Sequence, residues 1–176
     1  IYKILTSENP KDAIPLLINL FDRLDLAVNN GNGYKDFIGN QCISTGHCLA
    51  WAESYIMQAY ADMFEATGKI KYLDKLYSHI ISVIKNRDDY RGKSSVPCWG
   101  TDRYSREGKW EYYAAHTAMI TYPMLEFIYI VRKYNIQKYL PTTNFILDKV
   151  EESINYHNKE WSEKFGLYVR PGTEKI

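Results

Sequence analysis

The sequence lacks three features that would decide its class at once: a long hydrophobic run, an excess of one charge, and a set of paired cysteines. Charged residues interrupt every apolar stretch before it reaches the roughly 18 residues that a membrane-spanning helix needs. Lysine and arginine number 22 against 21 aspartates and glutamates, so no strong field attracts nucleic acid or an anionic membrane. We therefore expect a soluble protein that binds neither nucleic acid nor membrane.

The three cysteines, Cys42, Cys48 and Cys98, do not have the spacing of a zinc site or a disulfide framework. Buried free thiols are the simplest interpretation, and a Cys42–Cys98 or Cys48–Cys98 disulfide is the alternative. The histidines and carboxylates show no metal-binding spacing. No phosphate-binding glycine loop and no G-x-S-x-G nucleophile motif occurs. The sequence therefore predicts no metal and no cofactor.

A chain of 176 residues, 45% of them hydrophobic, is long enough to bury one sizeable core. We expect a single helical domain over residues 1–176. The sequence begins with Ile1 rather than methionine, and Leu167–Gly172 near its end has the pattern of an extended segment and a turn. These features favour truncation at both ends.

Apolar residues recur at helical spacing in several segments, which predicts an all-α fold of about five to six helices. The expected helices cover residues 10–28, 47–66, 71–86, 110–134 and 141–157. Pro123 predicts a kink or break near residues 119–122 of the fourth helix. The short connection between the second and third helices makes them an antiparallel hairpin. In the first helix, the stripe expected to face the core consists of Ile14, Leu17, Ile18, Phe21, Leu24 and Val28.

Two helix connections have matching sequences, which predicts an internal repeat. Gly68 precedes Lys71–Leu73, and Asn135 precedes Lys138–Leu140 at the same spacing, with Lys-Tyr-Leu in both places. Glycine and asparagine are the residues best suited to the left-handed conformation that ends a helix. We therefore expect a repeat of helical hairpins.

The segments Trp51–Tyr55, Met63–Gly68 and Tyr72–Lys75 resemble hairpins of the α/α-toroid carbohydrate-active proteins. These proteins include six-hairpin glycosidases, polysaccharide lyases and the helical domains of uronyl epimerases. The tail Tyr156–Trp161, followed by Gly166–Tyr168, is similar to the passage of such repeats into an aromatic loop on the substrate side. The resemblance covers roughly residues 47–170. It implies a partial ring, an oligo- or polysaccharide partner, and an extracellular or periplasmic location, but it identifies no catalytic residue.

Three residues are candidates for acid–base catalysis. Glu53 lies at the edge of the apolar stripe of the second helix, where partial desolvation raises the pKa of a carboxyl group. His116 falls on the same helix face as Tyr113, and a histidine–tyrosine pair can abstract a proton next to a carboxylate. For both Glu53 and His116, the alternative is a buried side chain satisfied by one hydrogen bond.

The connection before the fourth helix is rich in aromatic and charged residues. It combines flat apolar rings with a charge pair, which is how sugars are bound: a ring stacks on Trp or Tyr while Asp and Arg bridge hydroxyls or a carboxylate. The alternative is a loop fixed to the helices by burial of its tryptophan. The candidate substrate-binding residues are Trp99, Asp102, Arg103, Tyr104 and Trp110.

These patterns favour a carbohydrate-interacting domain, as part of a polysaccharide-processing enzyme of the glycoside hydrolase, lyase or uronyl epimerase kind, and they leave open whether it is catalytic. The alternative is a non-catalytic helical repeat scaffold that binds a protein or forms an oligomer with its own copy, because stacked hairpins leave end faces that need a partner. A terpenoid-type α/α barrel is less favoured, since no Asp-rich metal motif occurs. The carbohydrate hypothesis requires the helical pairs to converge on a shared, aromatic-walled hollow.

Overall fold

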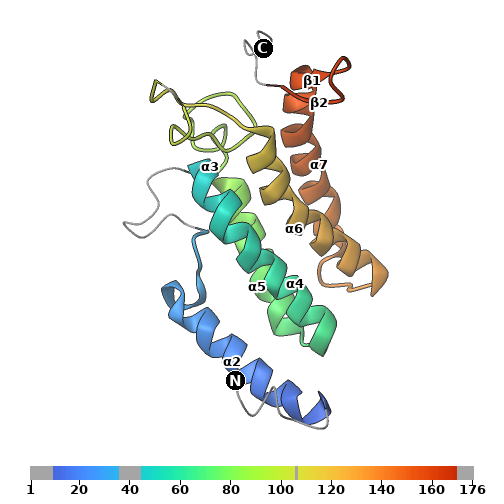
Figure 1. Cartoon of the computed structure of the whole chain (residues 1–176). Coiled ribbons are helices and arrows are strands. Elements are labelled where there is room, and N and C mark those ends of the chain that lie inside the picture. Colours follow the sequence, from blue (N-terminus) through green and yellow to red (C-terminus); the bar gives the residue numbers. More distant parts are fainter. Residues whose placement is uncertain (1–9, 36–44, 106, 170–176) are drawn as a thin grey trace.

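The computed structural model describes residues 10–35, 45–105 and 107–169, which are mostly helical (Figure 1). The long helices are α2 (Pro10–Ala27), α4 (Ser54–Thr67), α5 (Ile70–Lys85), α6 (Ala114–Lys133) and α7 (Leu140–Tyr156). Shorter segments are η1 (Asn29–Gly31), α3 (Thr45–Cys48), the π-helical turn η2 (Leu49–Glu53) and η3 (His157–Glu160). Strands β1 (Trp161–Ser162) and β2 (Leu167–Tyr168) pair antiparallel. The prediction of an all-α fold is confirmed.

Two helical hairpins build the core. α4 packs against α5, α6 packs against α7, and α4 and α6 pack directly on each other. The residue that ends the first helix of each hairpin is left-handed: Gly68 after α4 has φ 64°, and Asn135 after α6 has φ 51°. Both matched positions of the sequence therefore end a helix in the way expected. The fully buried residues that meet in the core include Leu49, Met57, Tyr60, Leu73, Leu76, Ile80, Ile120, Met124, Phe127 and Ile146.

The matched residues of the two hairpins also make matched contacts. The pair Lys71–Tyr72, at the start of α5, donates two hydrogen bonds to Asp22 of α2, at 2.5 and 2.9 Å. The pair Lys138–Tyr139, just before the start of α7, donates two to Asp74 of α5. Each lysine–tyrosine pair thus joins the second helix of its hairpin to an earlier helix. α2, α5 and α7 form one connected row, and α4 and α6 form the other.

The packing of α2 differs from the prediction. Phe21 does pack against the core, between the rings of Tyr60 and Tyr72. Asp22 and Asp25 also point toward the hairpin of α4 and α5, where Asp25 accepts hydrogen bonds from Tyr60 of α4 and from Lys75 of α5. Because this helix docks largely through carboxylates, much of its apolar stripe is left outside. The residues that were wrongly expected to face inward and are exposed are Ile14, Leu17, Leu24 and Val28.

α6 begins at Ala114, later than predicted, because Thr101 and Glu111 pair their backbones at 2.8 and 2.9 Å and hold the preceding chain extended. The helix runs through Pro123 without the expected break. Its contacts with α4 and α7 compensate for the hydrogen bond that proline removes. Two large apolar residues of α7 are exposed, Phe145 and Ile154.

The cysteines differ in state. Cys98 is a buried free thiol, so both predicted disulfides that include Cys98 are wrong. Cys48 is disulfide-bonded, which corrects the prediction of a free thiol at this position. Cys42 lies outside the described residues. Separately, none of the described helices is long and apolar enough to cross a membrane.

Candidate functional site

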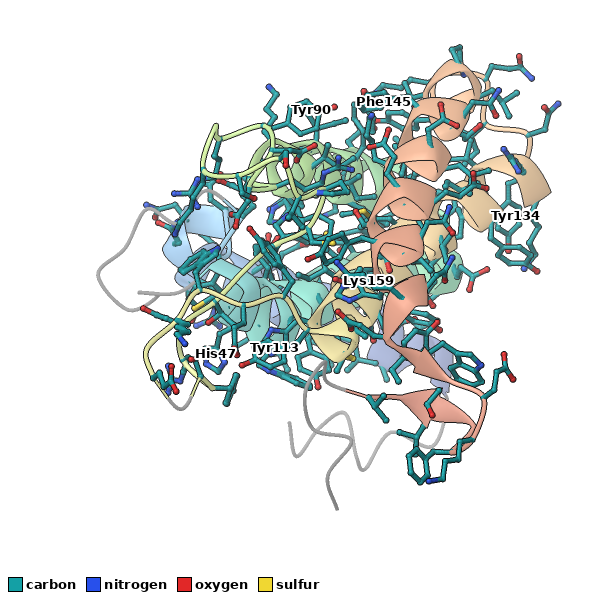
Figure 2. All side chains as sticks on the ribbon, turned by 90° about the horizontal axis from the view of Figure 1, so that it is seen from above. His47, Tyr90, Tyr113, Tyr134, Phe145 and Lys159 are labelled. Carbon is teal, nitrogen blue, oxygen red and sulfur yellow. The ribbon has the colours of Figure 1, made fainter. Side chains whose placement is uncertain are left out.

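Five ring-bearing side chains gather where α3 and η2 meet the beginning of α6. They are termed the aromatic cluster and consist of His47, Trp51, Tyr104, Tyr113 and His116. Figure 2 shows the His47 and Tyr113 side chains on the same side of the molecule, well away from Tyr134. The cluster therefore combines residues from three helical segments, α3, η2 and α6, with residues from the connection that precedes α6.

Tyr104 lies at the centre of the aromatic cluster. The centroid of its ring is 5.4 Å from that of His47, 6.1 Å from that of Tyr113 and 5.5 Å from that of His116. Its hydroxyl is 2.7 Å from Nδ1 of His47. Tyr104 is 48% exposed and Trp51 is 42% exposed, whereas His116 is 3% exposed. The cluster thus presents two partly exposed rings beside a buried imidazole.

Local backbone structure explains why these side chains meet. His47 and Trp51 are four residues apart and therefore share a face of the helical run α3–η2. Gly46 donates a backbone hydrogen bond to Gly100 at 2.9 Å, which ties α3 to the connection. A Cβ on Gly46 would collide with the carbonyl oxygen of Trp99, so only glycine allows this approach. The connection that carries Tyr104 is thereby held against the helix that carries His47 and Trp51.

The electrostatics of the cluster keep its buried histidine neutral. Burial, with a smaller contribution from the charge of His47, lowers the pKa of His116 to about 4. The pKa of His47 is itself lowered, by burial and by the charge of Arg103. Trp51 donates its indole N–H to Nε2 of His116 at 3.1 Å. Nδ1 of His116 is buried and has no hydrogen-bond partner among the described residues.

A cavity of about 630 Å³ lies between α6, the end of α7 and the chain around β2. Tyr113 belongs both to this cavity wall and to the aromatic cluster, so the two adjoin. Tyr112 is another wall residue. Burial, more than any other effect, raises its pKa to about 12, so its phenol is protonated at neutral pH. The aromatic residues of the wall are Tyr112, Tyr113, Tyr122 and Tyr168, and its polar ones include Thr117, Thr121, His157 and Glu160.

The polar part of the cavity wall is a chain of hydrogen bonds. Nδ1 of His157 is 2.8 Å from Oε2 of Glu160, and its Nε2 is 2.9 Å from the hydroxyl of Thr117. The sulfur of Cys98 is 3.7 Å from the same Nε2. Burial raises the pKa of the Cys98 thiol to about 12, and the thiol donates to the carbonyl of Ser153. Cys98 is therefore not a thiolate nucleophile at neutral pH.

The structure brings together some of the residues predicted from the sequence. His116, Tyr113 and Tyr104 are in the aromatic cluster, and Arg103 acts on it through its charge on His47. Glu53 belongs to neither the cluster nor the cavity wall. Its carboxylate is fully buried, contacts His79 and accepts a hydrogen bond from the backbone N–H of Tyr34 at 2.7 Å.

The other predicted substrate-binding residues lie elsewhere. Trp99 is 1% exposed and donates its indole N–H to the carbonyl of Val83 at 2.7 Å, so its ring is part of the core. Trp110 packs against Gly100 and donates to buried Asp88 at 2.5 Å. Asp102 is exposed in a turn. The helical pairs were expected to converge on a shared, aromatic-walled hollow, but the lining residues of the cavity begin at Tyr112 and include none of the predicted substrate-binding residues.

Sequence reasoning missed four residues of the site. Trp51 and His47 have i,i+4 spacing and His157 and Glu160 have i,i+3 spacing, which place each pair on one helical face. That spacing was the available signal. Which face would point toward a cavity could not be predicted, because this depends on where the connection before α6 and the chain around β2 pack.

Within residues 10–35, 45–105 and 107–169, no group of three or more histidines, cysteines or carboxylates could hold a metal ion. Comparisons of the chain with protein-family models, curated proteins and solved structures find no match. Any functional conclusion must therefore be drawn from the geometry of the cluster and the cavity.

Proposed function

We propose that this chain is a carbohydrate-interacting domain in which the aromatic cluster and the adjoining cavity bind an oligo- or polysaccharide. The observation that carries the proposal is the pair of half-exposed rings, Trp51 and Tyr104, beside a buried imidazole and a cavity. Sugar rings have apolar faces that stack on Trp and Tyr, and hydroxyls that need polar partners. The site offers both kinds of contact.

The size and polarity of the cavity support the same proposal. Its volume of about 630 Å³ lies within the range of roughly 300–1,000 Å³ that is usual for small-ligand sites. Glu160 and Thr117 supply a carboxylate and a hydroxyl within a wall that is otherwise largely aromatic and aliphatic. If the domain also processes a polysaccharide, His116 and Tyr113 are the candidate acid–base pair, with ring centroids 5.1 Å apart.

The arrangement of helices supports a partial α/α-toroid-like architecture as part of the proposal. The row of α2, α5 and α7 and the row of α4 and α6 are what a curved stack of helical hairpins contains. The repeated contacts of lysine and tyrosine with an aspartate join successive hairpins. The disulfide at Cys48 is typical of oxidising compartments, which supports an extracellular or periplasmic location.

Tyr104→Ala tests the proposal, and Tyr134→Ala is its matched control because both residues are 48% exposed. We expect a glycan array and calorimetric titration to identify neutral or uronate-containing oligosaccharides that bind the chain. Loss of one stacking ring should then weaken binding about tenfold in Tyr104→Ala, while Tyr134→Ala binds as the unmodified chain does. Flat titrations against the whole panel, or equal losses in both variants, contradict the proposal.

One observation favours the second candidate function, a helical scaffold that self-associates. α2 exposes several large apolar side chains, among them Leu17 and Leu24, which are seven residues apart and lie on one face. If this face binds a second copy, light scattering should show a dimer, and the double variant Leu17→Lys, Leu24→Lys should be monomeric with unchanged thermal unfolding of the monomer. A chain that is monomeric at high concentration rules out self-association through this face.

A further inference from the structure

We propose that His116 selects ligands by donating a hydrogen bond from Nδ1–H to an oxygen acceptor, in a tautomer that Trp51 fixes. The identity of the ligand rests on the proposed function above. The tautomer rests only on the contact between the two side chains. His116 therefore becomes a specificity-determining residue that acts as a neutral donor, which differs from the acid–base role suggested by the sequence.

The tautomer follows from the chemistry of the partner. The indole Nε1 of Trp51 carries a hydrogen and has no lone pair to accept with, so it can only donate. It lies 3.1 Å from Nε2 of His116. Nε2 must therefore be the unprotonated nitrogen of the ring, and a neutral His116 carries its proton on Nδ1.

The same contact leaves a donor without an acceptor. Nδ1 of His116 is fully buried and has no partner in the described part of the chain, although buried polar groups in proteins are nearly always hydrogen-bonded. Its surroundings are rings rather than aliphatic core: Trp51, Tyr104 and Tyr113 all contact the imidazole. Because Tyr104 is half-exposed and contacts the imidazole, we expect a ligand to reach His116 by displacing this ring and to stack on it.

The charges around His116 favour an acceptor that is anionic. The groups that face it are the indole of Trp51, the phenols of Tyr104 and Tyr113, and, one shell further, His47 with Arg103 beside it. The hydroxyl of Tyr113 donates a hydrogen bond to the carboxylate of Glu111 at 2.6 Å. Two full charges lie beyond these rings: the carboxylate of Glu111, which is engaged by the Tyr113 hydroxyl, and the guanidinium of Arg103 beside His47, which is the one that attracts a carboxylate. We expect uronate-containing oligosaccharides to bind more tightly than neutral ones, and cationic amino sugars to bind least.

Nitrogen-15 NMR of the histidine side chains tests the tautomer without any ligand. At pH 7 we expect His116 to show a protonated Nδ1 and an unprotonated Nε2. Trp51→Phe keeps an apolar ring but removes the indole donor, so the spectrum of this variant should shift toward the Nε2–H form or a mixture. A protonated Nε2 in the unmodified chain overturns the inference, whatever the sugar titrations give.

Two substitutions at the same position test the donor. The amide nitrogen of His116→Asn can take the place of Nδ1–H, whereas the longer side chain of His116→Gln reaches the place of Nε2 and leaves no donor at Nδ1. We expect His116→Gln to bind a uronate oligosaccharide about tenfold more weakly than His116→Asn. The two variants should bind a neutral oligosaccharide with equal affinity, and this comparison controls for disruption of the cluster.

The possible failures can be told apart. If the tautomer is as expected but no saccharide binds, the proposed function fails and the ligand part of the inference fails with it, while the assignment of the proton to Nδ1 stands. If saccharides bind and His116→Gln binds uronates as well as His116→Asn does, the proposed function stands and the role of His116 as selective donor is wrong.

Discussion

Two buried histidines, His79 and His116, lie on either side of the π-helical turn η2 and differ in one respect. His79 is 1% exposed and has partners for both ring nitrogens, Glu53 at Nδ1 and the carbonyl oxygen of Gly31 at Nε2. His116 is 3% exposed and has a partner, Trp51, for Nε2 only. The two side chains are therefore buried to nearly the same extent. His116 has a ring nitrogen without a hydrogen-bond partner that could bind a ligand, whereas both ring nitrogens of His79 are engaged in holding the fold together.

His79 and Glu53 form a joint between the N-terminal region and the two hairpins. Glu53 comes from η2, His79 from α5, and the chain of η1 and its neighbours closes over them through Gly31 and Tyr34. Every polar group of this joint is used within the protein. The comparison predicts that damage to the joint lowers stability and leaves ligand binding unchanged, while damage at His116 does the reverse.

The largest effect is expected for Glu53→Ala. This change leaves the buried imidazole of His79 without its carboxylate, and removal of one partner from a buried pair costs about 3–5 kcal/mol of unfolding free energy. Urea denaturation should show the loss, while saccharide affinity measured on the folded variant stays the same. A loss of affinity with intact stability would instead restore the catalytic role that the sequence suggested for Glu53.

His116 should contribute to the pH dependence of the unfolding free energy. Its pKa is lowered from 6.5 to about 4 in the folded chain, so the unfolded chain binds this proton more readily. Stability should fall as the pH drops from about 6.5 to about 4 and level off below, with about 3 kcal/mol attributable to this group. Denaturation of the unmodified chain and of His116→Gln across this range isolates the contribution. Parallel curves would contradict the prediction.

A smaller effect is expected for Gly33→Ala. The residue has φ 51°, and an added Cβ would lie 2.6 Å from Oε2 of Glu53, so both strain and a collision should destabilise the joint, by about 1–2 kcal/mol. Gly92→Ala is the control, because Gly92 is also left-handed but has no atom within 4 Å of the added Cβ. The difference in thermal unfolding between the two variants measures the collision alone. Equal changes in the thermal unfolding of the two variants would show that the Glu53 side chain moves aside without cost.

The parts of the fold that could be predicted from the sequence are those in which apolar residues recur with one regular spacing. The helix predicted over residues 71–86 corresponds to α5, and the glycine and asparagine expected to end helices are left-handed. The apolar residues of α5 that recur at helical spacing and are buried are Leu73, Leu76, Ile80, Val83 and Ile84. α2 was misjudged because its docking depends on two aspartates, which an apolar stripe does not include. The π-helical turn was missed because a pattern with α-helical period cannot show a residue inserted into it.

For the candidate site, the spacing of Tyr113 and His116 was enough to place them together. Trp99 could not be placed, because a tryptophan in an aperiodic connection serves equally well as a core residue or a ligand platform. Its burial is decided by contacts with α5, such as the hydrogen bond to Val83, that are distant in sequence. Trp51 was missed for a different reason. It lies in a helix, and it becomes part of a candidate site only because the connection that carries Tyr104 packs beside it.

The turn η2 also affects how this chain would compare with relatives of different length. A π-helical turn holds one residue more than an α-helical turn, so the extra residue is absorbed within Leu49–Glu53 and the helical run before it keeps its face relative to α4. Deleting one residue between Leu49 and Glu53 should therefore convert the turn to an α-helical one and leave His47 beside Tyr104. A single-residue gap at this turn in an alignment would thus be compatible with relatives that keep both the helical bundle and the aromatic cluster.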